Sequence, residues 1–436
     1  MGLFSSDALQ PGVRKREVFG WAMYDFANSG YTTVVLTAVF AAYFVSVAAQ
    51  GATWATFAWT VALAISNALV MLTAPVLGAW ADARGSKKHL LWISTLGCVA
   101  CTAALGWVGP GMVALGMALI ILSNLCYAWG ESLIAAFLPE LARPEALGRV
   151  SGWGWSFGYV GGMLTLGLSL AYVLGAQARG EAARDFVPVT MWITAVVFGV
   201  AALATLVLLR ERSAGARRTV AFGWRSVWRQ QAASWRLARG YPDFVWLLGC
   251  TVAYQAGVAV TIALAAIYAE QVIGFQQQET MLMIFVLNIA AAVGAFAFGY
   301  WQDRLGHKRA LALTLVGWTL TCVVAALATT KGAFWVAAVI AGVCMGSSQS
   351  AGRAMAGLLA PRERLAEFYG LWTFANRLAG IIGPLTYGLV TLVTGGNQRL
   401  AIAVTALMFV AGLLILWPIR LERGRARALV TLRPEA

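Results

Sequence analysis

The segment Gly78-Ala-Trp-Ala-Asp82-Ala-Arg84-Gly85 recurs 221 residues later as Gly299-Tyr-Trp-Gln-Asp303-Arg304-Leu-Gly306. Each copy ends a long apolar stretch, and Lys or Arg residues follow it within three positions. Residues 145–152 recur at nearly the same offset as residues 363–370, with Glu, Leu and Gly at matching places. Two motifs repeating at one period predict a chain built from two homologous halves in the same orientation.

The composition indicates that most of the chain lies in a lipid bilayer. Hydrophobic residues make up 60% of the 436 residues and charged residues 11%, with a mean hydropathy of +0.73. Soluble domains carry about 45–50% apolar and about 25% charged residues, which argues against a soluble enzyme and against disorder. A spanning helix needs roughly 20 residues, and twelve apolar stretches reach this length. They are 18–48, 55–80, 90–108, 112–138, 150–175, 188–209, 244–268, 280–301, 310–329, 334–358, 369–394 and 400–419.

We therefore expect an all-α membrane protein with twelve transmembrane helices in two six-helix repeats. Parallel repeats joined by a central polar segment are the architecture of the major facilitator fold. The predicted parts are an N-terminal half at 1–209, a cytoplasmic amphipathic linker at 210–243, a C-terminal half at 244–420 and a cytoplasmic tail at 421–436.

The basic residues predict the orientation. The net charge of +14 comes from 32 Lys and Arg residues against 18 Asp and Glu residues. About 27 of the basic residues fall on the side of the two termini, and Lys and Arg collect in cytoplasmic loops. Arg179, Arg184, Lys331 and Arg399 fall on the other side. We expect both termini in the cytoplasm, and this rule explains the charge better than a nucleic-acid partner does.

The linker combines tryptophan with arginine. Trp224, Trp228 and Trp235 share one helical face, and each is followed by an arginine. Such a helix can lie in the membrane interface, with Trp among the headgroups and Arg on the phosphates. Calmodulin-like or nucleic-acid binding fits the pattern less well.

The sequence carries no pattern typical of an enzyme. All six cysteines lie in apolar stretches, and the Cys98–Cys101 spacing has no histidine or second pair beside it. His89 and His307 lie at predicted loop edges. We find no nucleophile–base pair, metal-ligand cluster or phosphate loop, so we expect no enzyme, no metal and no cofactor.

Three segments resemble a known family. They are Gly20-Trp-Ala-Met-Tyr24-Asp25-Phe26-Ala27-Asn28-Ser29, Ala136-Phe-Leu-Pro139-Glu140 and Gly346-Ser-Ser-Gln349-Ser350-Ala-Gly-Arg353. With the repeated Gly-x-x-x-Asp motif, they resemble the vacuolar amino-acid effluxer-like branch of the major facilitator superfamily, over nearly the whole chain. The resemblance implies a secondary transporter, in a bacterial inner membrane, and fungal members export amino acids from the vacuole. One departure is in the seventh span, where family members tend to carry an Asp beside Gly and this chain has Tyr254-Gln255-Ala256-Gly257.

The resemblance also implies a gating role for the repeated motif. In the superfamily, the motif carboxylate sits against a helix N-terminus, which is partially positive, while the cytoplasmic side is closed. Asp82 would then contact the start of the eleventh span and Asp303 that of the fifth, biasing a two-state equilibrium. Ala83 departs from the family, which has Arg there. The candidate gating residues are Gly78, Asp82, Arg84, Gly85, Gly299, Asp303, Arg304 and Gly306.

Polar residues inside the spans give the candidate substrate and coupling site, because a charge in a span is costly and by default functional. Glu131 either exchanges a proton or forms a permanent ion pair with an arginine. Arg353 and Arg377 either hold a substrate carboxylate or neutralise Asp25 and Glu131. The candidates are Asp25, Asn28, Glu131, Gln255, Gln349, Arg353, Asn376 and Arg377.

Other residues in the spans are expected to be structural. The third, sixth, ninth and twelfth spans contain no Asn or Gln, as suits the outer helices of this fold. The glycines of the fifth span, including Gly154 and Gly161, predict close helix packing. Trp153 and Trp155 fit membrane-interface anchors better than a substrate-stacking site.

The sequence therefore predicts a secondary active transporter that works by alternating access. Its substrate is expected to be a small polar solute, amino acids or short peptides, with proton coupling as an open possibility. An exporter of amphipathic drugs and a non-transporting membrane sensor remain the alternatives. The expected partners are the small-molecule substrate, protons and the lipid bilayer, and we expect a monomer.

Overall fold

The computed structural model describes residues 4–52, 54–212, 224–275 and 277–429. In these ranges the chain is helical, apart from connecting turns and an isolated bridge between Leu9 and Ala142. Residues 213–223 of the predicted linker and 430–436 of the predicted tail lie outside the described residues.

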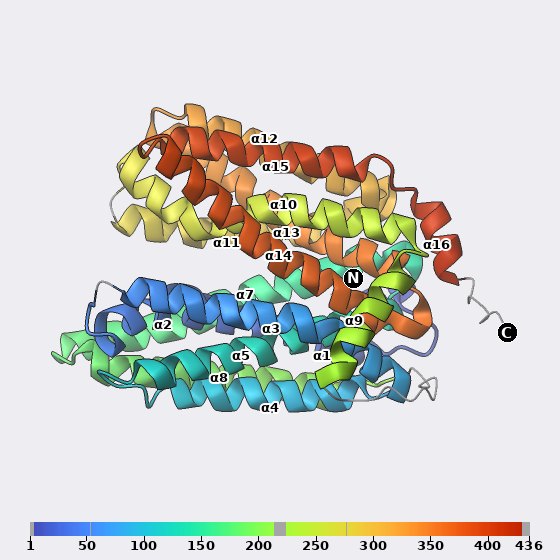
Figure 1. The fold of residues 1–436 in the computed structure, drawn as a ribbon, viewed down its shortest axis with the longest axis horizontal. Coiled ribbons are helices and arrows are strands. Elements are labelled where there is room, and N and C mark those ends of the chain that lie inside the picture. The colour runs from blue at the N-terminus through green and yellow to red at the C-terminus, as the bar shows by residue number, and fades with distance from the viewer. Residues whose placement is uncertain (1–3, 53, 213–223, 276, 430–436) are drawn as a thin grey trace.

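The described helices form twelve spans. The spans run side by side (Figure 1). In the first span, α1 (Lys15–Tyr31) continues through the π-helical turns Thr32–Ala38 and Phe44–Ala48, which flank α2 (Phe40–Tyr43). The rest of the N-terminal half is α3 (Ala55–Arg84), α4 (Lys87–Leu105), α5 (Val113–Ala135) with the short α6 (Leu138–Leu141), α7 (Leu147–Ala178) and α8 (Ala183–Leu208). The C-terminal half is α10 (Pro242–Tyr268), α11 (Gln277–Leu305), α12 (His307–Leu327), α13 (Lys331–Leu359), α14 (Leu365–Val393) and α15 (Gln398–Leu416). Two helices lie outside the spans, α9 (Trp224–Ala238) and α16 (Leu421–Leu429).

The spans fit a lipid bilayer. Eleven helical segments of the described chain are long and apolar enough to cross a membrane. The twelfth is α14, whose apolar sequence is interrupted by Asn376 and Arg377. The expected all-α membrane fold with twelve spans is confirmed, and the helix bounds lie within a few residues of the apolar stretches.

The helices form two bundles that meet along a seam. Within the described residues, α3 packs on α14, and α7 packs on α11 and α13, so these helices join the halves. The main contacts of α4, α8, α12 and α15 all lie within their own half. These four are the third, sixth, ninth and twelfth spans, so the expected outer helices are confirmed.

The repeat extends to ion pairs of buried acids at the helix starts. Glu17 at the start of α1 binds Arg212, which follows α8, with 2.6 Å between Oε2 and Nη2. Asp243 at the start of α10 binds Arg423 of α16, with 2.8 Å between Oδ1 and Nη2. Both acids are buried. Each half thus ties its first span to the segment that follows its sixth.

One end of the molecule carries both described chain ends together with α9 and α16 (Figure 1). We call it the basic end, because most Lys and Arg residues lie in its connections. Helix α9 packs there against α3 and α14. Trp228 is 55% exposed, whereas Trp235 packs edge-to-face on Phe374 with ring centroids 5.4 Å apart. The two tryptophans therefore have different environments.

Candidate functional site

A buried ion pair joins the two halves. Asp25 lies on α1 and Arg353 on α13, with 2.6 Å between Oδ2 and Nη1, and their side chains are 11% and 4% exposed. Arg353 also donates from Nε to the Ser151 hydroxyl at 3.1 Å and from Nη2 to the Ser151 carbonyl at 2.8 Å. Every guanidinium nitrogen of Arg353 is therefore bonded within the protein.

Aromatic rings enclose this ion pair. The Arg353 guanidinium carbon lies 4.7 Å from the ring centroid of Trp21 and 5.3 Å from that of Trp155, within cation–π range. A Cβ on Gly154 would lie 2.4 Å from Asp25 Oδ2, so only glycine fits beside the pair. The expectation that Trp153 and Trp155 are membrane-interface anchors is wrong. Trp153 is buried and donates to the Tyr300 hydroxyl, and Trp155 covers Arg353.

A second ion pair joins the halves and is more open. Glu131 of α5 and Arg377 of α14 are 3.0 Å apart between Oε2 and Nη2, with side chains 31% and 18% exposed. The Arg377 guanidinium also lies 5.7 Å from the ring centroid of Tyr127. Its Nε is buried and makes no hydrogen bond to any described atom. This pair is thus more exposed than Asp25 and Arg353, and Arg377 has a guanidinium nitrogen without a hydrogen bond.

The four amide candidates form no common cluster. Gln255 and Gln349 bond each other within the C-terminal half, through reciprocal amide contacts of 2.7 and 3.2 Å. Asn376 donates to the Trp372 carbonyl of its own helix at 2.9 Å. Asn28 is buried and follows Asp25 by three positions on α1. Its Oδ1 makes no hydrogen bond within the described chain. The structure therefore does not bring Asn28 and Asn376 into either ion pair.

The first copy of the repeated motif meets the start of α14. Asp82 accepts hydrogen bonds from the backbone N–H of Ala366 at 3.2 Å and of Glu367 at 2.9 Å. A Cβ on Gly78 would lie 2.1 Å from the Ala366 carbonyl oxygen, so the contact between α3 and α14 requires glycine there. Gly85 ends α3 with φ of 59°, a left-handed conformation that favours glycine.

The second copy makes the equivalent contact at the start of α7. Asp303 accepts from the backbone N–H of Gly148 at 3.0 Å and of Arg149 at 3.2 Å, and from Arg149 Nε at 3.0 Å. Gly299 lies against this turn, and Gly306 (φ 89°) connects α11 to α12. Both motif carboxylates thus lie at helix N-termini of the opposite half, where the partial positive charge favours an anion.

The two motif arginines lie away from these contacts. Arg84 is exposed and stacks on Trp80 of its own helix, 4.5 Å from the ring centroid. Arg304 is also exposed. The motif therefore contributes its carboxylates and glycines to the seam, and not its arginines.

Sequence reasoning missed several residues at the seam. Ser151 and Trp21 hold Arg353, and Arg149 binds Asp303 with its backbone and side chain. The signal for Ser151 was the motif Gly148-Arg149-Val-Ser151-Gly152 at the start of the fifth span, which has a counterpart in the other half. Trp21 carried no such signal, because an apolar ring in a span is ordinarily a packing residue.

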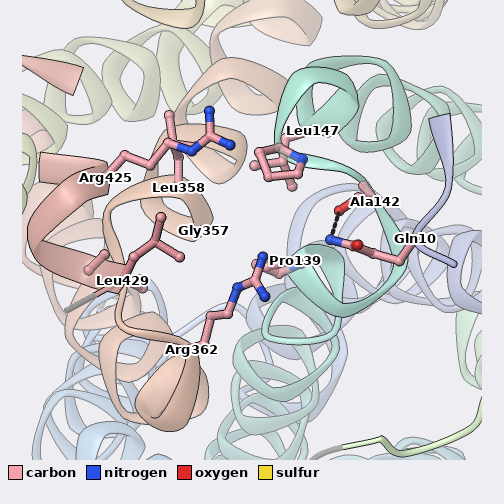
Figure 2. A pocket seen from close by; sticks show the side chains of 12 residues that line it. Gln10, Pro139, Ala142, Leu147, Gly357, Leu358, Arg362, Arg425 and Leu429 are labelled. Atoms are coloured by element: carbon pink, nitrogen blue, oxygen red, sulfur yellow. Dashed lines mark hydrogen bonds between the residues drawn. The ribbon is translucent and has the colours of Figure 1, made fainter. Parts of the chain in front are cut away.

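A small pocket lies at the basic end, and neither ion pair lines it. The N-terminal segment, α6, the end of α13 and α16 surround it, with Arg362 and Arg425 at its edge (Figure 2). Gln10 donates to the Ala142 carbonyl across one wall at 3.0 Å. Its volume of about 30 Å³ has room for only a few water molecules. Nor do the described residues gather three or more His, Cys, Asp or Glu side chains for a metal.

Comparisons with known proteins identify relatives of this chain. Residues 52–429 match the family described as "Vacuole effluxer Atg22 like". The "Uncharacterized MFS-type transporter YxiO" of Bacillus subtilis (strain 168) is 26% identical over 407 residues, 91% of this chain and 93% of that protein. "Autophagy-related protein 22" of Cryptococcus neoformans var. neoformans serotype D (strain B-3501A) is 26% identical over 203 residues, 43% of this chain and 37% of that protein.

The fold itself is found among solved transporters. The human organic anion transporter MFSD10 (TETRAN) aligns with a TM-score of 0.74 at 14% identity, covering 93% of this chain and all of that one. At this identity the likeness shows the fold alone. The family match and the shared fold together show that this chain belongs to the vacuole effluxer Atg22-like family and is a membrane transporter of the major facilitator fold.

Proposed function

We propose that this transporter moves small solutes that carry a carboxylate, amino acids or short peptides, by alternating access, and that Glu131 exchanges the coupling proton. The basic end is proposed to face the cytoplasm of a bacterium, because Lys and Arg collect in cytoplasmic loops. The contacts of Asp82 and Asp303 with helix starts of the opposite half support the proposal that this end is closed in the state described.

The observation that carries the proposal is the contrast between the two ion pairs. Arg353 is 4% exposed, bonded at every guanidinium nitrogen and enclosed by rings, so it is poorly accessible to a substrate. Arg377 makes one contact to a partly exposed Glu131 and has a buried Nε without a hydrogen bond. A carboxylate fits a guanidinium through two parallel hydrogen bonds, so Arg377 is the better anchor for a solute.

The same pair provides a coupling mechanism. A solute carboxylate that binds Arg377 displaces Glu131 from its cation. An unpaired carboxylate in a water-poor interior is costly, so Glu131 takes up a proton from the open side. After the halves rock and the solute leaves, Glu131 releases the proton and binds Arg377 again. One proton then moves with each solute carboxylate, in the same direction.

The test is counterflow in proteoliposomes with labelled amino acids and dipeptides, each compared with its C-terminal amide. Counterflow requires no assumption about the coupling ion. We expect saturable exchange of one class of acid, and at least tenfold weaker exchange of the matching amide. Equal exchange of an acid and its amide would contradict binding through the carboxylate. If folded protein exchanged none of the amino acids or dipeptides, the proposed substrate class would be wrong.

A further inference from the structure

Helix α9, which connects the halves in the sequence, also bridges them in space. It crosses the basic ends of α3, from the N-terminal half, and α14, from the C-terminal half (Figure 1). Since opening of the basic end would separate α3 from α14, α9 cannot keep both contacts in the open state. The docked position of α9 therefore belongs to the closed state.

The inner face of α9 is fixed by a buried carboxylate. The Ser234 hydroxyl donates to Glu367 Oε1, and both residues are buried. Gln230 Nε2 also donates to Glu367 Oε1, at 3.5 Å, and Arg364 binds Oε2 at 3.2 Å. A buried carboxylate that lost these donors would be strongly destabilised, so the bond to Ser234 orders α9 on α14.

Glu367 also takes part in the contact between Asp82 and the start of α14, which we call the gate. Its backbone N–H donates to Asp82 Oδ2 at 2.9 Å, while its side chain holds Ser234. Glu367, in the first turn of α14, thus bonds both Asp82 of α3 and Ser234 of α9. Movement of α9 and opening of the gate must consequently be coupled.

The outer face of α9 suits a negatively charged membrane surface. Trp228 is 55% exposed, and Arg229 and Arg236 on the same side of the helix are exposed, as is Arg239 in the turn that follows α9. Helix α9 lies at the level where the spans end (Figure 1). Tryptophan prefers the headgroup layer, and arginines near a cytoplasmic leaflet are attracted to its anionic lipids.

We propose that the outer face of α9 binds anionic phospholipid headgroups, and that this binding stabilises the closed gate at the basic end. The inference rests on the proposed sidedness and gating role. Lipid that holds α9 in its docked position also holds Ser234 on Glu367, and with it the start of α14 on Asp82. The membrane composition then regulates how often the transporter opens toward the cytoplasm.

The experiment measures the gate distance in the full-length protein in lipid nanodiscs. Spin labels are placed at His89→Cys in the N-terminal half and Glu363→Cys in the C-terminal half, both exposed, after the six native cysteines are replaced. We expect a larger short-distance population with 30% phosphatidylglycerol than with phosphatidylcholine alone, by at least threefold. In Arg229→Gln/Arg236→Gln this lipid effect should disappear.

Three controls keep the outcomes distinct. Arg179→Gln/Arg184→Gln removes two exposed charges from the opposite end and should keep the lipid effect. Ser234→Ala should lower the short-distance population in both lipids. Asp82→Asn should do the same, and if it does not, the gating role itself fails.

Two results would overturn the proposal. One is a distance distribution in the wild type that is the same in both lipids while Asp82→Asn still shifts it. The other is a short-distance population that rises equally with inorganic phosphate in phosphatidylcholine, because the ligand would then be a free anion and not a lipid.

Discussion

Asp25 of α1 and Arg353 of α13 form the most enclosed ion pair that joins the two halves in the described chain, with 2.6 Å between Oδ2 and Nη1. The more open pair, Glu131 and Arg377, has the same polarity, because the acid comes from the N-terminal half and the base from the C-terminal half. If the two halves separate at these helices, both ion pairs must break. Because the two pairs are buried to different extents, we expect them to have different roles.

We expect the buried ion pair of Asp25 and Arg353 to stabilise the folded protein. Asp25→Ala leaves the Arg353 guanidinium buried without its partner, which typically costs about 3–5 kcal/mol. We expect the midpoint of denaturation in detergent to fall accordingly. Asp25→Leu/Arg353→Met, which removes both charges, should recover much of the loss. A single variant as stable as the wild type would show that Asp25 does not stabilise Arg353.

The motif carboxylates make a prediction about conformation. A carboxylate at a helix N-terminus contributes about 0.3–2 kcal/mol, so Asp82→Asn or Asp303→Asn should reduce the closed population roughly 2- to 30-fold. The spin labels at His89→Cys and Glu363→Cys measure this change. The control is Asp185→Asn, since Asp185 accepts from Ala182 N–H within one half and should leave the distance unchanged.

The close approach of α3 and α14 makes a prediction about packing. In Gly78→Ala the new Cβ would lie 2.1 Å from the Ala366 carbonyl oxygen, so the closed gate cannot form without moving backbone. We expect counterflow to fall at least tenfold in a protein that still folds. Gly380→Ala on α14 is the control, because nothing lies within 4 Å of its Cβ. Transport by Gly78→Ala at the rate of Gly380→Ala would refute the packing argument.

Arg377 makes a prediction about affinity. Hydrogen bonds to a charged group contribute about 1.5–3 kcal/mol, so Arg377→Gln should weaken binding of the transported carboxylate about 10- to 150-fold. The apparent KM of counterflow measures this loss. Arg184→Gln, at an exposed position outside the seam, should keep the wild-type KM. An unchanged KM in Arg377→Gln would show that Arg377 does not bind the carboxylate of the solute.

Much of the fold could be predicted because its signals are local. Apolar stretches of spanning length give the helix bounds, and Gly85 ends α3 through its left-handed backbone. The contacts of Asp82 and Asp303 followed from the resemblance, since a motif at repeat spacing implies its structural partner. In the structure both carboxylates lie at those helix starts.

The pairing of the charges could not be predicted. Asp25, Glu131, Arg353 and Arg377 lie at similar depth, so the sequence is compatible with either arginine for each acid. Which pair forms depends on the rotation of helices from different halves about their axes. Trp155 shows the same limit, because only the packing of α7 beside α13 places its ring on Arg353.

The most direct test of the account compares the wild type with Glu131→Gln in proteoliposomes, for whichever solute exchanges in counterflow. Both the exchange rate and the accumulation driven by a pH gradient are measured. We expect Glu131→Gln to keep exchange but to lose accumulation driven by the gradient, because Gln can leave Arg377 but cannot carry a proton. Driven accumulation at the wild-type rate and with the wild-type pH dependence would contradict it.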